Sequence, residues 1–433
     1  MKELDSYYAE QLETLKKFDP DIYRLIQLEL KRQSETLQLI AAENVSSKFV
    51  LAALGNVLNN KTAEGTIGHR YHGGCEYVDE IERLAVERAK EVTESRMVWL
   101  QPHSGSQANQ IVYFSVLNPR DKILSLALEH GGHLSHGSPY SITGKFFNVD
   151  FYYLDRETHL LDYNKIRKKA KEFRPKLIIC GYSSYPREIN FKLFREIADE
   201  VGAYLLADVS HIFGLILGGV YPSPVPYADF VTTSTYKCGG PRGGAIIAGD
   251  NLPESFFKKV DYAVFPGIQS TPYFNNIAAK AVFFKEAQTE RYKETQRRIV
   301  RNAKKMAEEF INLGYDVLTG GTDTHLFLIN VRPLNLTGFI VEKALEECGV
   351  ILNRNILPYD ELGPVVTSGI RIGTNVVSRI GMREEEMKEI ASHIDEVIRR
   401  IRPINKTSYK LDKEFIRKKR EEIRELMKNY PLP

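Results

Sequence analysis

Lys237 and Asp208 each stand at the end of an apolar, β-branched run. The first run reads Asp229-Phe-Val-Thr-Thr-Ser-Thr-Tyr-Lys237 and continues into glycine-rich sequence; the second reads Tyr204-Leu-Leu-Ala-Asp208. An amine and a carboxylate at the ends of neighbouring strands suit pyridoxal phosphate (PLP), because the amine bonds to its aldehyde and the carboxylate keeps the pyridine nitrogen protonated. Short motifs have low specificity, and the pair taken alone fits a solvent-facing lysine and aspartate better.

A second stretch has the composition of an anion site. Gln101-Pro-His-Ser-Gly-Ser-Gln-Ala-Asn109 follows the apolar residues 97–100 and precedes residues 111–117, which read as a helix. Small hydroxyl residues and a glycine at the start of a helix bind anions through free N–H groups and the positive end of the helix dipole. A phosphate fits this stretch, and the alternative is an ordinary serine N-cap without a ligand.

Six of the ten histidines lie between residues 69 and 136, including His130, His133 and His136 in one short segment. A metal site is one interpretation, but no acidic residues or cysteines recur beside them at ligand spacing. We therefore expect no metal. One imidazole stacked on a flat cofactor, with structural roles for the others, explains these histidines better.

Arg371 lies in a short apolar stretch between two glycines, Thr367-Ser-Gly-Ile-Arg371-Ile-Gly-Thr. The planar guanidinium group binds a carboxylate through two parallel hydrogen bonds, so Arg371 is a candidate for holding the carboxylate of a substrate. A surface ion pair explains the same residue equally well.

The elements that must position these residues alternate between helix and strand from about residue 80 to 280. Residues 176–180 and 204–208 read as strands, and residues 194–201 between them as a helix. Short strand–helix–strand links imply parallel strands, and the lack of polar alternation implies that helices cover both faces of the sheet. A long helical stretch over residues 276–313 should lead to a second domain.

The bulk composition is that of a globular protein of two domains. The chain has 433 residues, 43% of them hydrophobic and 27% charged, and no apolar run is long enough to span a membrane. The beginning of the chain lacks the apolar core of a signal peptide. Four widely spaced cysteines predict neither disulfides nor zinc and favour a reducing cytoplasm.

The net charge of +3 gives no case for nucleic acid. The excess of positive charge lies in residues 409–433, with eight Lys and Arg against five Asp and Glu. A mixed-charge helical face explains this tail better than a site for polyanions.

From about residue 35 to 400 the chain closely resembles serine hydroxymethyltransferase, a family of fold-type I PLP enzymes. The matching motifs are Ala63-Glu-Gly65, Arg70-Tyr71, Gly73-Gly-Cys-Glu-Tyr-Val-Asp79, residues 101–109, His130-Gly-Gly-His-Leu-Ser-His-Gly-Ser-Pro139, Phe265-Pro-Gly267, Gly320-Gly-Thr-Asp323, His325-Leu-Phe-Leu and Thr367-Ser-Gly-Ile-Arg-Ile-Gly-Thr374. The resemblance implies an α/β fold like that of aspartate aminotransferase, with a mixed, mostly parallel sheet and a smaller α+β C-terminal domain. It divides the chain into a helical arm for dimer contact (1–60), a large PLP-binding domain (61–285) and a small domain with a basic tail (286–433).

The resemblance also implies a role for each matching residue. Lys237 would bind PLP covalently, Asp208 would pair with the pyridine nitrogen, and His133 would stack on the ring. Arg371 would hold the substrate carboxylate and Glu64 would transfer protons near the hydroxymethyl carbon. Ser104, Gly105, Ser106 and Gly267 would contact the cofactor, and Ser183 and His211 would contact the cofactor oxygen or the substrate carboxylate. Tyr71 would act in catalysis and in substrate binding. The residues implied to contact folate are Glu64, Tyr71, Leu128, Gly132, Leu134 and Asn355.

The expected activity is the reversible transfer of a hydroxymethyl group between an amino acid and tetrahydrofolate. The family forms dimers, or dimers of dimers, with shared active sites, so Glu64 and Tyr71 would reach the site of a partner subunit. We expect no nucleic acid and no membrane among the partners.

The chain departs from the family pattern near the lysine and the α-carbon of the substrate. Thr62 and His72 stand where the family usually has tyrosine, and the other departures are Ala42, Tyr236, a shortened Lys237-to-Arg242 spacing and Gln269-Ser-Thr-Pro272. Space opened at Thr62 and His72 would admit an α-methyl group, so the pair resembles the branch that acts on 2-methylserine and D-alanine. We expect that substrate, and the alternative is the ordinary enzyme for L-serine and glycine.

Two other functions remain alternatives. A folate-independent aldolase or transaldolase could use the same scaffold, although the retained folate positions argue against it. A non-catalytic PLP-fold protein could bind nucleic acid through its basic tail, but intact Lys237, Asp208 and Arg371 argue against that.

Overall fold

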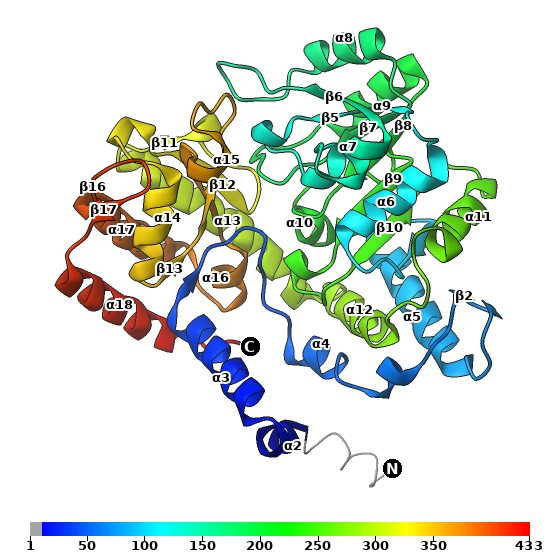
Figure 1. The fold of residues 1–433 in the computed structure, drawn as a ribbon, viewed down its shortest axis with the longest axis horizontal. Helices are drawn as coiled ribbons and strands as arrows, with labels where there is room; N and C mark the ends of the chain where they lie inside the picture. Colours follow the sequence, from blue (N-terminus) through cyan, green and yellow to red (C-terminus); the bar gives the residue numbers. More distant parts are fainter. Residues whose placement is uncertain (1–10) are drawn as a thin grey trace.

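A seven-stranded sheet forms the centre of the larger part of the molecule (Figure 1). The computed structural model describes residues 11–433. Five neighbouring strands run parallel, while β10 runs antiparallel to both β9 and β4. The strand order is β4 (Met97–Trp99), β10 (Gly244–Ala248), β9 (Phe230–Ser234), β8 (Tyr204–Asp208), β7 (Leu177–Cys180), β5 (Lys122–Leu126) and β6 (Asn148–Tyr152).

Helices cover both faces of this sheet, because successive strand residues point to opposite sides and both sides are apolar. In β8, Leu205 and Ala207 enter one core cluster and Leu206 enters the other. The first cluster includes residues of α5 (Glu76–Thr93), α8 (Tyr163–Phe173), α9 (Phe191–Val201), α10 (Phe213–Leu217) and α12 (Phe274–Ala287). The second includes residues of α6 (Gly105–Val116), α11 (Ser255–Tyr262) and η5 (Ala263–Ile268).

Local signals place the ends of the helices that cross between strands. Asn190 caps α9 by accepting a hydrogen bond from the N–H of Leu193, and Gly202 ends that helix in the left-handed conformation at φ 66°. Only glycine adopts that conformation without a steric penalty. The short exit after Gly202 leads directly into β8, whose last residue is Asp208.

The smaller part contains a four-stranded antiparallel sheet packed against helices. Its strand order is β11 (Asp316–Val317), β12 (Leu326–Asn330), β15 (Gly369–Gly373) and β14 (Asn353–Asn355). The apolar faces of α13 (Glu290–Asn312), α14 (Gly338–Glu347), α17 (Glu384–Arg400) and α18 (Lys413–Lys428) share one core cluster with it. The shorter elements here are β13 (Val350–Ile351), α15 (Gly363–Val366), α16 (Asn375–Arg379), β16 (Arg402–Pro403) and β17 (Tyr409–Lys410).

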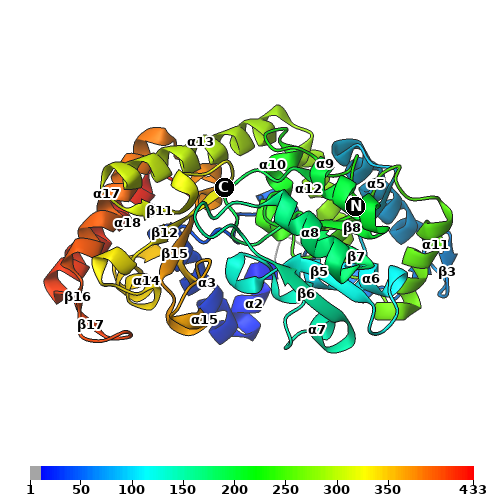
Figure 2. The same cartoon turned by 90° about the horizontal axis from the view of Figure 1, so that it is seen from above.

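The long helix α13 runs from the larger part to the smaller one (Figure 2). The continuous helical stretch predicted over residues 276–313 is wrong in one respect: α12 ends at Ala287 and a new helix starts at Glu290. Thr289 caps α13 by accepting a hydrogen bond from the N–H of Tyr292. A threonine side chain that satisfies a free N–H group in this way favours a helix start at that point.

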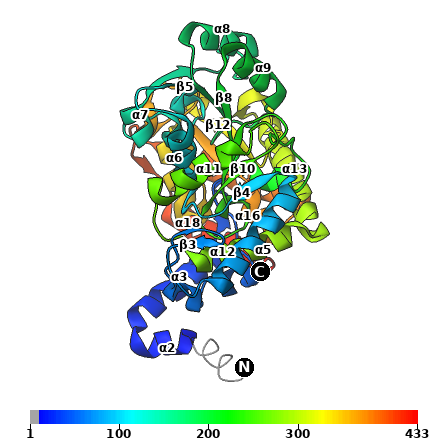
Figure 3. The ribbon, with the colours of Figure 1, turned by 90° about the vertical axis from the view of Figure 1, so that its right-hand side faces the viewer.

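The first described helices, α2 (Gln11–Phe18) and α3 (Pro20–Glu35), extend away from the body of the molecule (Figure 3). Neither helix has a buried residue. Phe18 is 89% exposed, and five more large apolar side chains of α3 are exposed: Ile22, Leu25, Ile26, Leu28 and Leu30. So much exposed apolar surface is typical of a segment that packs against another molecule.

The observed architecture is the predicted α/β fold with a mixed, mostly parallel sheet and a smaller α+β part. The domain boundaries at residues 60 and 285 stay predictions, and residues 1–10 of the predicted arm lie outside the described residues. Between residues 11 and 433, no helix is both long and apolar enough to cross a membrane.

Candidate active site

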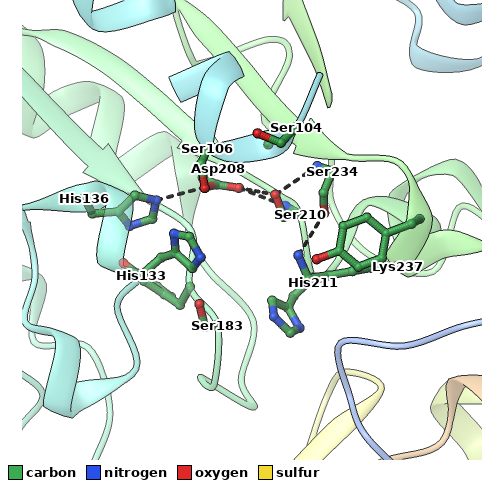
Figure 4. A pocket seen from close by; sticks show the side chains of 13 residues that line it. Ser104, Ser106, His133, His136, Ser183, Asp208, Ser210, His211, Ser234 and Lys237 are labelled. Atoms are coloured by element: carbon green, nitrogen blue, oxygen red, sulfur yellow. Dashed lines mark hydrogen bonds and ion pairs between the residues drawn. The ribbon is translucent and has the colours of Figure 1, made fainter. Parts of the chain in front are cut away.

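A pocket lies where the carboxyl ends of β7, β8 and β9 meet the start of α6. Ligands of open α/β sheets bind at this edge, outside the carboxyl ends of the strands. The pocket is lined by Ser104, Gly105, Ser106, His133, His136, Tyr182, Ser183, Asp208, Ser210, His211, Ser234, Tyr236 and Lys237 (Figure 4).

Asp208 is the most heavily hydrogen-bonded group of the pocket. It follows Ala207 in β8, so its side chain lies on the face that α6 covers. Its Oδ2 accepts hydrogen bonds from Asn109 Nδ2 at 2.8 Å and from His136 Nε2 at 2.9 Å. Its Oδ1 accepts from Ser210 Oγ at 2.6 Å and from the Ser210 N–H at 3.1 Å. Four donors therefore fix the carboxylate in place.

The same donors keep Asp208 ionised. Burial acts to raise the pKa of Asp208, but the hydrogen bond and charge of His136, helped by His133 and Ser210, outweigh burial and hold the pKa well below its usual range. A buried, permanently negative carboxylate can hold a proton on the nitrogen of a pyridine ring.

His133 presents a neutral imidazole to the pocket. Its Nδ1 accepts a hydrogen bond from the N–H of Ser135 at 3.2 Å, which leaves the proton on Nε2. Burial, together with His136, lowers the pKa of His133 to about 4. A neutral ring can stack on a flat aromatic group without placing a second positive charge beside Lys237.

Lys237 lies in the short helix η4 (Tyr236–Cys238), which directly follows β9. Its Nζ donates a hydrogen bond to Ser234 Oγ at 2.8 Å and lies 4.7 Å from the ring centre of Tyr236. Gly239 ends the turn at φ 96°, a conformation that glycine adopts readily. The Lys237 carbonyl also accepts a hydrogen bond from Asn44 Nδ2 at 3.1 Å. Hydrogen bonds of its side chain and of its carbonyl oxygen therefore hold Lys237 in place, with the amine in the pocket.

The anion end of the pocket lies at the start of α6. Ser104 is the N-cap residue, and its Oγ accepts a hydrogen bond from the Gln107 N–H. The predicted helix over residues 111–117 starts too late, because the helix already begins at Gly105. A Cβ on Gly105 would lie 3.2 Å from Ser234 Cβ, a tight contact, so glycine favours the close approach of the helix start to β9. The first N–H groups of α6 remain available to an anion.

Arg371 is a buried cation beside the pocket. It is 9% exposed, and it donates hydrogen bonds to the Ser183 carbonyl at 2.7 Å and to Asn353 Oδ1 at 3.1 Å. Burial lowers the pKa of Arg371 to about 10, so it stays charged at neutral pH. Within residues 11–433, no Asp or Glu forms an ion pair with it. A buried cation without a counter-ion is suited to an anionic ligand.

His211 lies between the charges of Lys237 and Arg371. Burial lowers the pKa of His211 well below its usual value, and the charges of Lys237 and Arg371 lower it further. Its Nδ1 lies 3.4 Å from His325 Nε2. The pocket thus combines an amine, a fixed carboxylate, neutral imidazoles and an anion site, with a guanidinium group beside it that has no carboxylate partner among residues 11–433.

Comparison with known proteins identifies the family to which this arrangement belongs. A family model for serine hydroxymethyltransferase matches residues 15–394. The chain is also 48% identical over 419 residues to serine hydroxymethyltransferase of Methanosarcina barkeri (strain Fusaro / DSM 804), which covers 96% of this chain and 99% of the relative. The chain belongs to the serine hydroxymethyltransferase family. It is therefore a hydroxymethyltransferase of fold type I, in a family that uses PLP and tetrahydrofolate.

The pocket fits the family's cofactor in the chemistry of its donors. An aldehyde can reach Lys237, a pyridine nitrogen can face the buried Asp208, and a phosphate can occupy the start of α6. Asp208 and the start of α6 therefore match the pyridine nitrogen and the phosphate, which lie at opposite ends of PLP. Among residues 11–433, no group of His, Cys, Asp and Glu side chains is arranged to hold a metal ion.

Five of the predicted site residues that do not line this pocket within one chain lie close to one hairpin: Thr62, Glu64, Tyr71, His72 and Gly267. They lie around the short hairpin of β2 (Gly65–Thr66) and β3 (His69–Arg70) and the nearby η5. Tyr71 is 75% exposed, and its ring centre lies 5.3 Å from that of Phe265. Thr62 and His72 are also exposed. The fold therefore gathers these residues into a group of their own, the exposed group, in which Glu64 is half-buried and the other four residues are exposed.

The four other positions expected to contact folate lie on two segments. Gly132 is buried, and a Cβ there would lie 2.3 Å from the Leu126 carbonyl oxygen, so the backbone demands glycine. Leu128 and Leu134 are 39% and 53% exposed. Asn355 in β14 donates a weak hydrogen bond to Ser184 Oγ at 3.4 Å. These positions come from both parts of the molecule, and their role stays a prediction.

Four further residues serve the pocket but were not predicted as contacts of the cofactor or substrate: Asn109, His136, Ser210 and Ser234. Asn109 lies four residues after Gly105, which places it on the same face of α6 as the anion site. Its side chain also accepts a hydrogen bond from Thr232 Oγ1 at 2.5 Å, which connects α6 to β9. Helical spacing could have identified Asn109, whereas the contact of His136 with Asp208 depends on the fold.

Proposed function

We propose that this chain interconverts L-serine and glycine and transfers the hydroxymethyl carbon to tetrahydrofolate. The proposal rests on Arg371. Its guanidinium group is buried, forms no ion pair with a carboxylate of the described residues, and lies beside the pocket that contains Lys237 and Asp208. An amino acid bound through its carboxylate to Arg371 would present its α-carbon near the amine of Lys237.

The cofactor, when bound, supplies the electron sink for cleavage at the α-carbon, and the residues of the chain orient the reactants. Asp208, held by four donors, would keep a proton on the ring nitrogen. His133 would pack against the ring, and Ser104, Gly105 and Ser106 would hold the phosphate. Arg371 would bind the substrate carboxylate and so orient the amino acid in the pocket.

The remaining role is proton transfer near the departing carbon, which we assign to Glu64. Its backbone N–H lies 3.4 Å from His72 Nδ1 and donates to it. Glu64 lies outside the pocket of its own chain. We therefore propose that Glu64 and Tyr71 act in the pocket of a partner subunit, with Thr62, His72 and Gly267 beside them.

A homodimer is the assembly that this proposal requires. The exposed apolar residues of α2 and α3 supply a surface that a second copy could cover, and a two-fold dimer would supply both missing halves at once. A dimer of dimers would satisfy the same requirement. All four cysteines are buried and unpaired, which supports proposing a reducing compartment such as the cytoplasm.

L-serine replaces 2-methylserine as the favoured substrate. The expectation of 2-methylserine came from Thr62 and His72 alone, whereas the relative with 48% identity over 96% of the chain is named for serine. Both residues are exposed within one chain, so the space that they leave at a substrate depends on a partner subunit. 2-Methylserine with D-alanine remains the second candidate.

The test is a side-by-side measurement of turnover with L-serine and 2-methylserine, each with and without tetrahydrofolate. We expect folate-dependent turnover that is faster with L-serine. Preference for 2-methylserine would overturn the substrate, and equal turnover without folate would favour an aldolase or transaldolase instead.

A further inference from the structure

Lys280 is a buried cation that the proposed reaction does not use. It lies in α12, is 1% exposed, and contacts backbone rather than a carboxylate. Its Nζ donates hydrogen bonds to the carbonyl oxygens of Leu100 at 2.6 Å, Gly244 at 2.8 Å and Pro102 at 3.3 Å. An ammonium group has three hydrogens, so these acceptors satisfy it completely.

The three acceptors belong to two neighbouring segments beside the cofactor pocket, one leading to the anion site and one following Lys237. Leu100 and Pro102 lie between β4 and Ser104, so they lead directly into the anion site. Gly244 begins β10, directly after the loop that follows Lys237. The two segments also bond to each other, because the Gly244 N–H donates to the Pro102 carbonyl at 3.0 Å. Lys280 thus connects the segment that leads into the anion site at Ser104 to the segment that follows Lys237.

The packing around this connection leaves no spare room. A Cβ on Gly244 would lie 2.2 Å from the Ser104 carbonyl oxygen, and a Cβ on Gly243 would lie 2.6 Å from Lys280 Cε. Both glycines are therefore required by close approach, one to the anion segment and one to the lysine stem. A shift of the Lys280 ammonium group would move both segments.

Burial of a charged group costs free energy, since water is lost as a partner. Burial lowers the pKa of Lys280 to about 7, because loss of water disfavours the charged form of the side chain. An apolar side chain would fill the same space without this penalty. Such a side chain would, however, leave three buried carbonyl oxygens without the donor that Lys280 gives them.

We propose that Lys280 is a positioning residue of the cofactor site, which sets the separation between the anion site at Ser104–Ser106 and the segment that carries Lys237. A ligand bound at both ends gains affinity when those ends are held at the correct spacing before it arrives. Lys280 acts through these segments and does not touch the cofactor. The inference rests on PLP binding in this pocket.

The test compares Lys280→Met with Lys285→Met, a control from the same helix whose lysine is exposed. Methionine keeps the length and apolar volume of the stem and removes all three donors. We expect the dissociation constant for PLP, measured by titration of the apoenzyme, to rise about tenfold to a hundredfold in Lys280→Met, since three buried acceptors lose their donor. The control should bind PLP like the parent chain.

The melting temperature of the apoenzyme separates positioning from stability alone. A lower melting temperature with unchanged PLP affinity would overturn the proposal, because it would make Lys280 a packing residue only. Should Lys280→Met fail to fold, Lys280→Gln retains two N–H donors, and a weaker but measurable loss of PLP affinity is expected. Unchanged affinity in that variant would equally overturn the proposal, while failure of the parent chain to bind PLP would overturn the proposed function as well.

Discussion

The pocket around Lys237 and the exposed group around Glu64 differ in how far one chain completes them. In the pocket, Asp208 has four donors and is 7% exposed, and Lys237 is held through both its side chain and its carbonyl. In the exposed group, Tyr71 is 75% exposed and its ring contacts Phe265. A single chain therefore forms a preorganised site for the cofactor, whereas the residues expected at the transferred carbon lie on an open surface.

This difference has a physical consequence for catalysis. Side chains that are already fixed in place, such as Asp208, can act on the cofactor without rearrangement. An acid–base group on an open surface becomes effective only when a second surface covers it and excludes water. Substitutions in one region at a time test this difference between the pocket and the exposed group.

The largest effect is expected for Lys237→Ala. Loss of the amine removes the covalent link to PLP, and turnover should fall by about a thousandfold or more, because other lysines lie outside the pocket. Borohydride reduction followed by peptide mapping checks the site, and Lys285→Ala is the control. Efficient trapping of PLP at another lysine in the variant would remove Lys237 from this role.

A slightly smaller effect is expected for Asp208→Asn. The amide is neutral and holds the ring nitrogen proton poorly, so turnover should drop by roughly a hundredfold to ten-thousandfold. Steady-state kinetics and circular dichroism would separate chemistry from folding. Near-normal activity would mean that the ring nitrogen has a partner other than Asp208.

The open region is tested by mixing two inactive variants, Lys237→Ala and Glu64→Gln. We expect Glu64→Gln alone to bind PLP normally but to transfer the hydroxymethyl group poorly. If Glu64 acts in the partner's pocket, a mixed dimer contains one intact site, and random pairing should restore about a quarter of the parent activity.

The mixing must follow dissociation and reassembly, with each variant reassembled alone as the control. No recovery of activity in the mixture would place Glu64 in the pocket of its own chain, or remove it from the reaction.

Substitution of Thr62 tests the space beside the substrate. Thr62→Tyr, alone or with His72→Tyr, should lower turnover of 2-methylserine relative to L-serine by about 10- to 200-fold, since a single methyl group carries that much discrimination. The ratio of kcat/KM for the two substrates is the measurement. An equal loss for both would indicate that the shortened loop after Lys237 has moved the whole site.

The smallest effect concerns acid stability and the buried histidines. Burial lowers the pKa of His130 to about 4, as it does for His133, against 6.5 in the unfolded chain. The unfolded state therefore binds protons first as pH falls, so stability should decline between about pH 6.5 and 4, by about 1.4 kcal/mol per pH unit for each such histidine.

Melting temperatures of the apoenzyme across this range test that slope. His130→Gln should flatten it by one histidine's share, whereas the exposed His69→Gln should not change it. An identical slope in His130→Gln and the parent chain would contradict the pKa assigned to His130.

Much of the fold was predictable because local patterns carry it. The strands at 177–180 and 204–208 follow from short apolar runs. The starts of α6, α9 and α13 were misplaced, because apolar periodicity does not mark the first turn of a helix, where Ser104, Asn190 and Thr289 act as N-caps.

The amino-acid sequence was sufficient for the family, the fold class and the choice of Lys237, Asp208 and Arg371 as candidates, since many motifs match one family together although each motif alone has an ordinary structural explanation. Only the tertiary structure decided which groups act on them. The bond from His136 to Asp208 spans 72 residues, and the bond from Lys280 to Leu100 spans 180. Such contacts are set by how strands and helices pack, and packing brings together residues whose spacing in the sequence carries no signal.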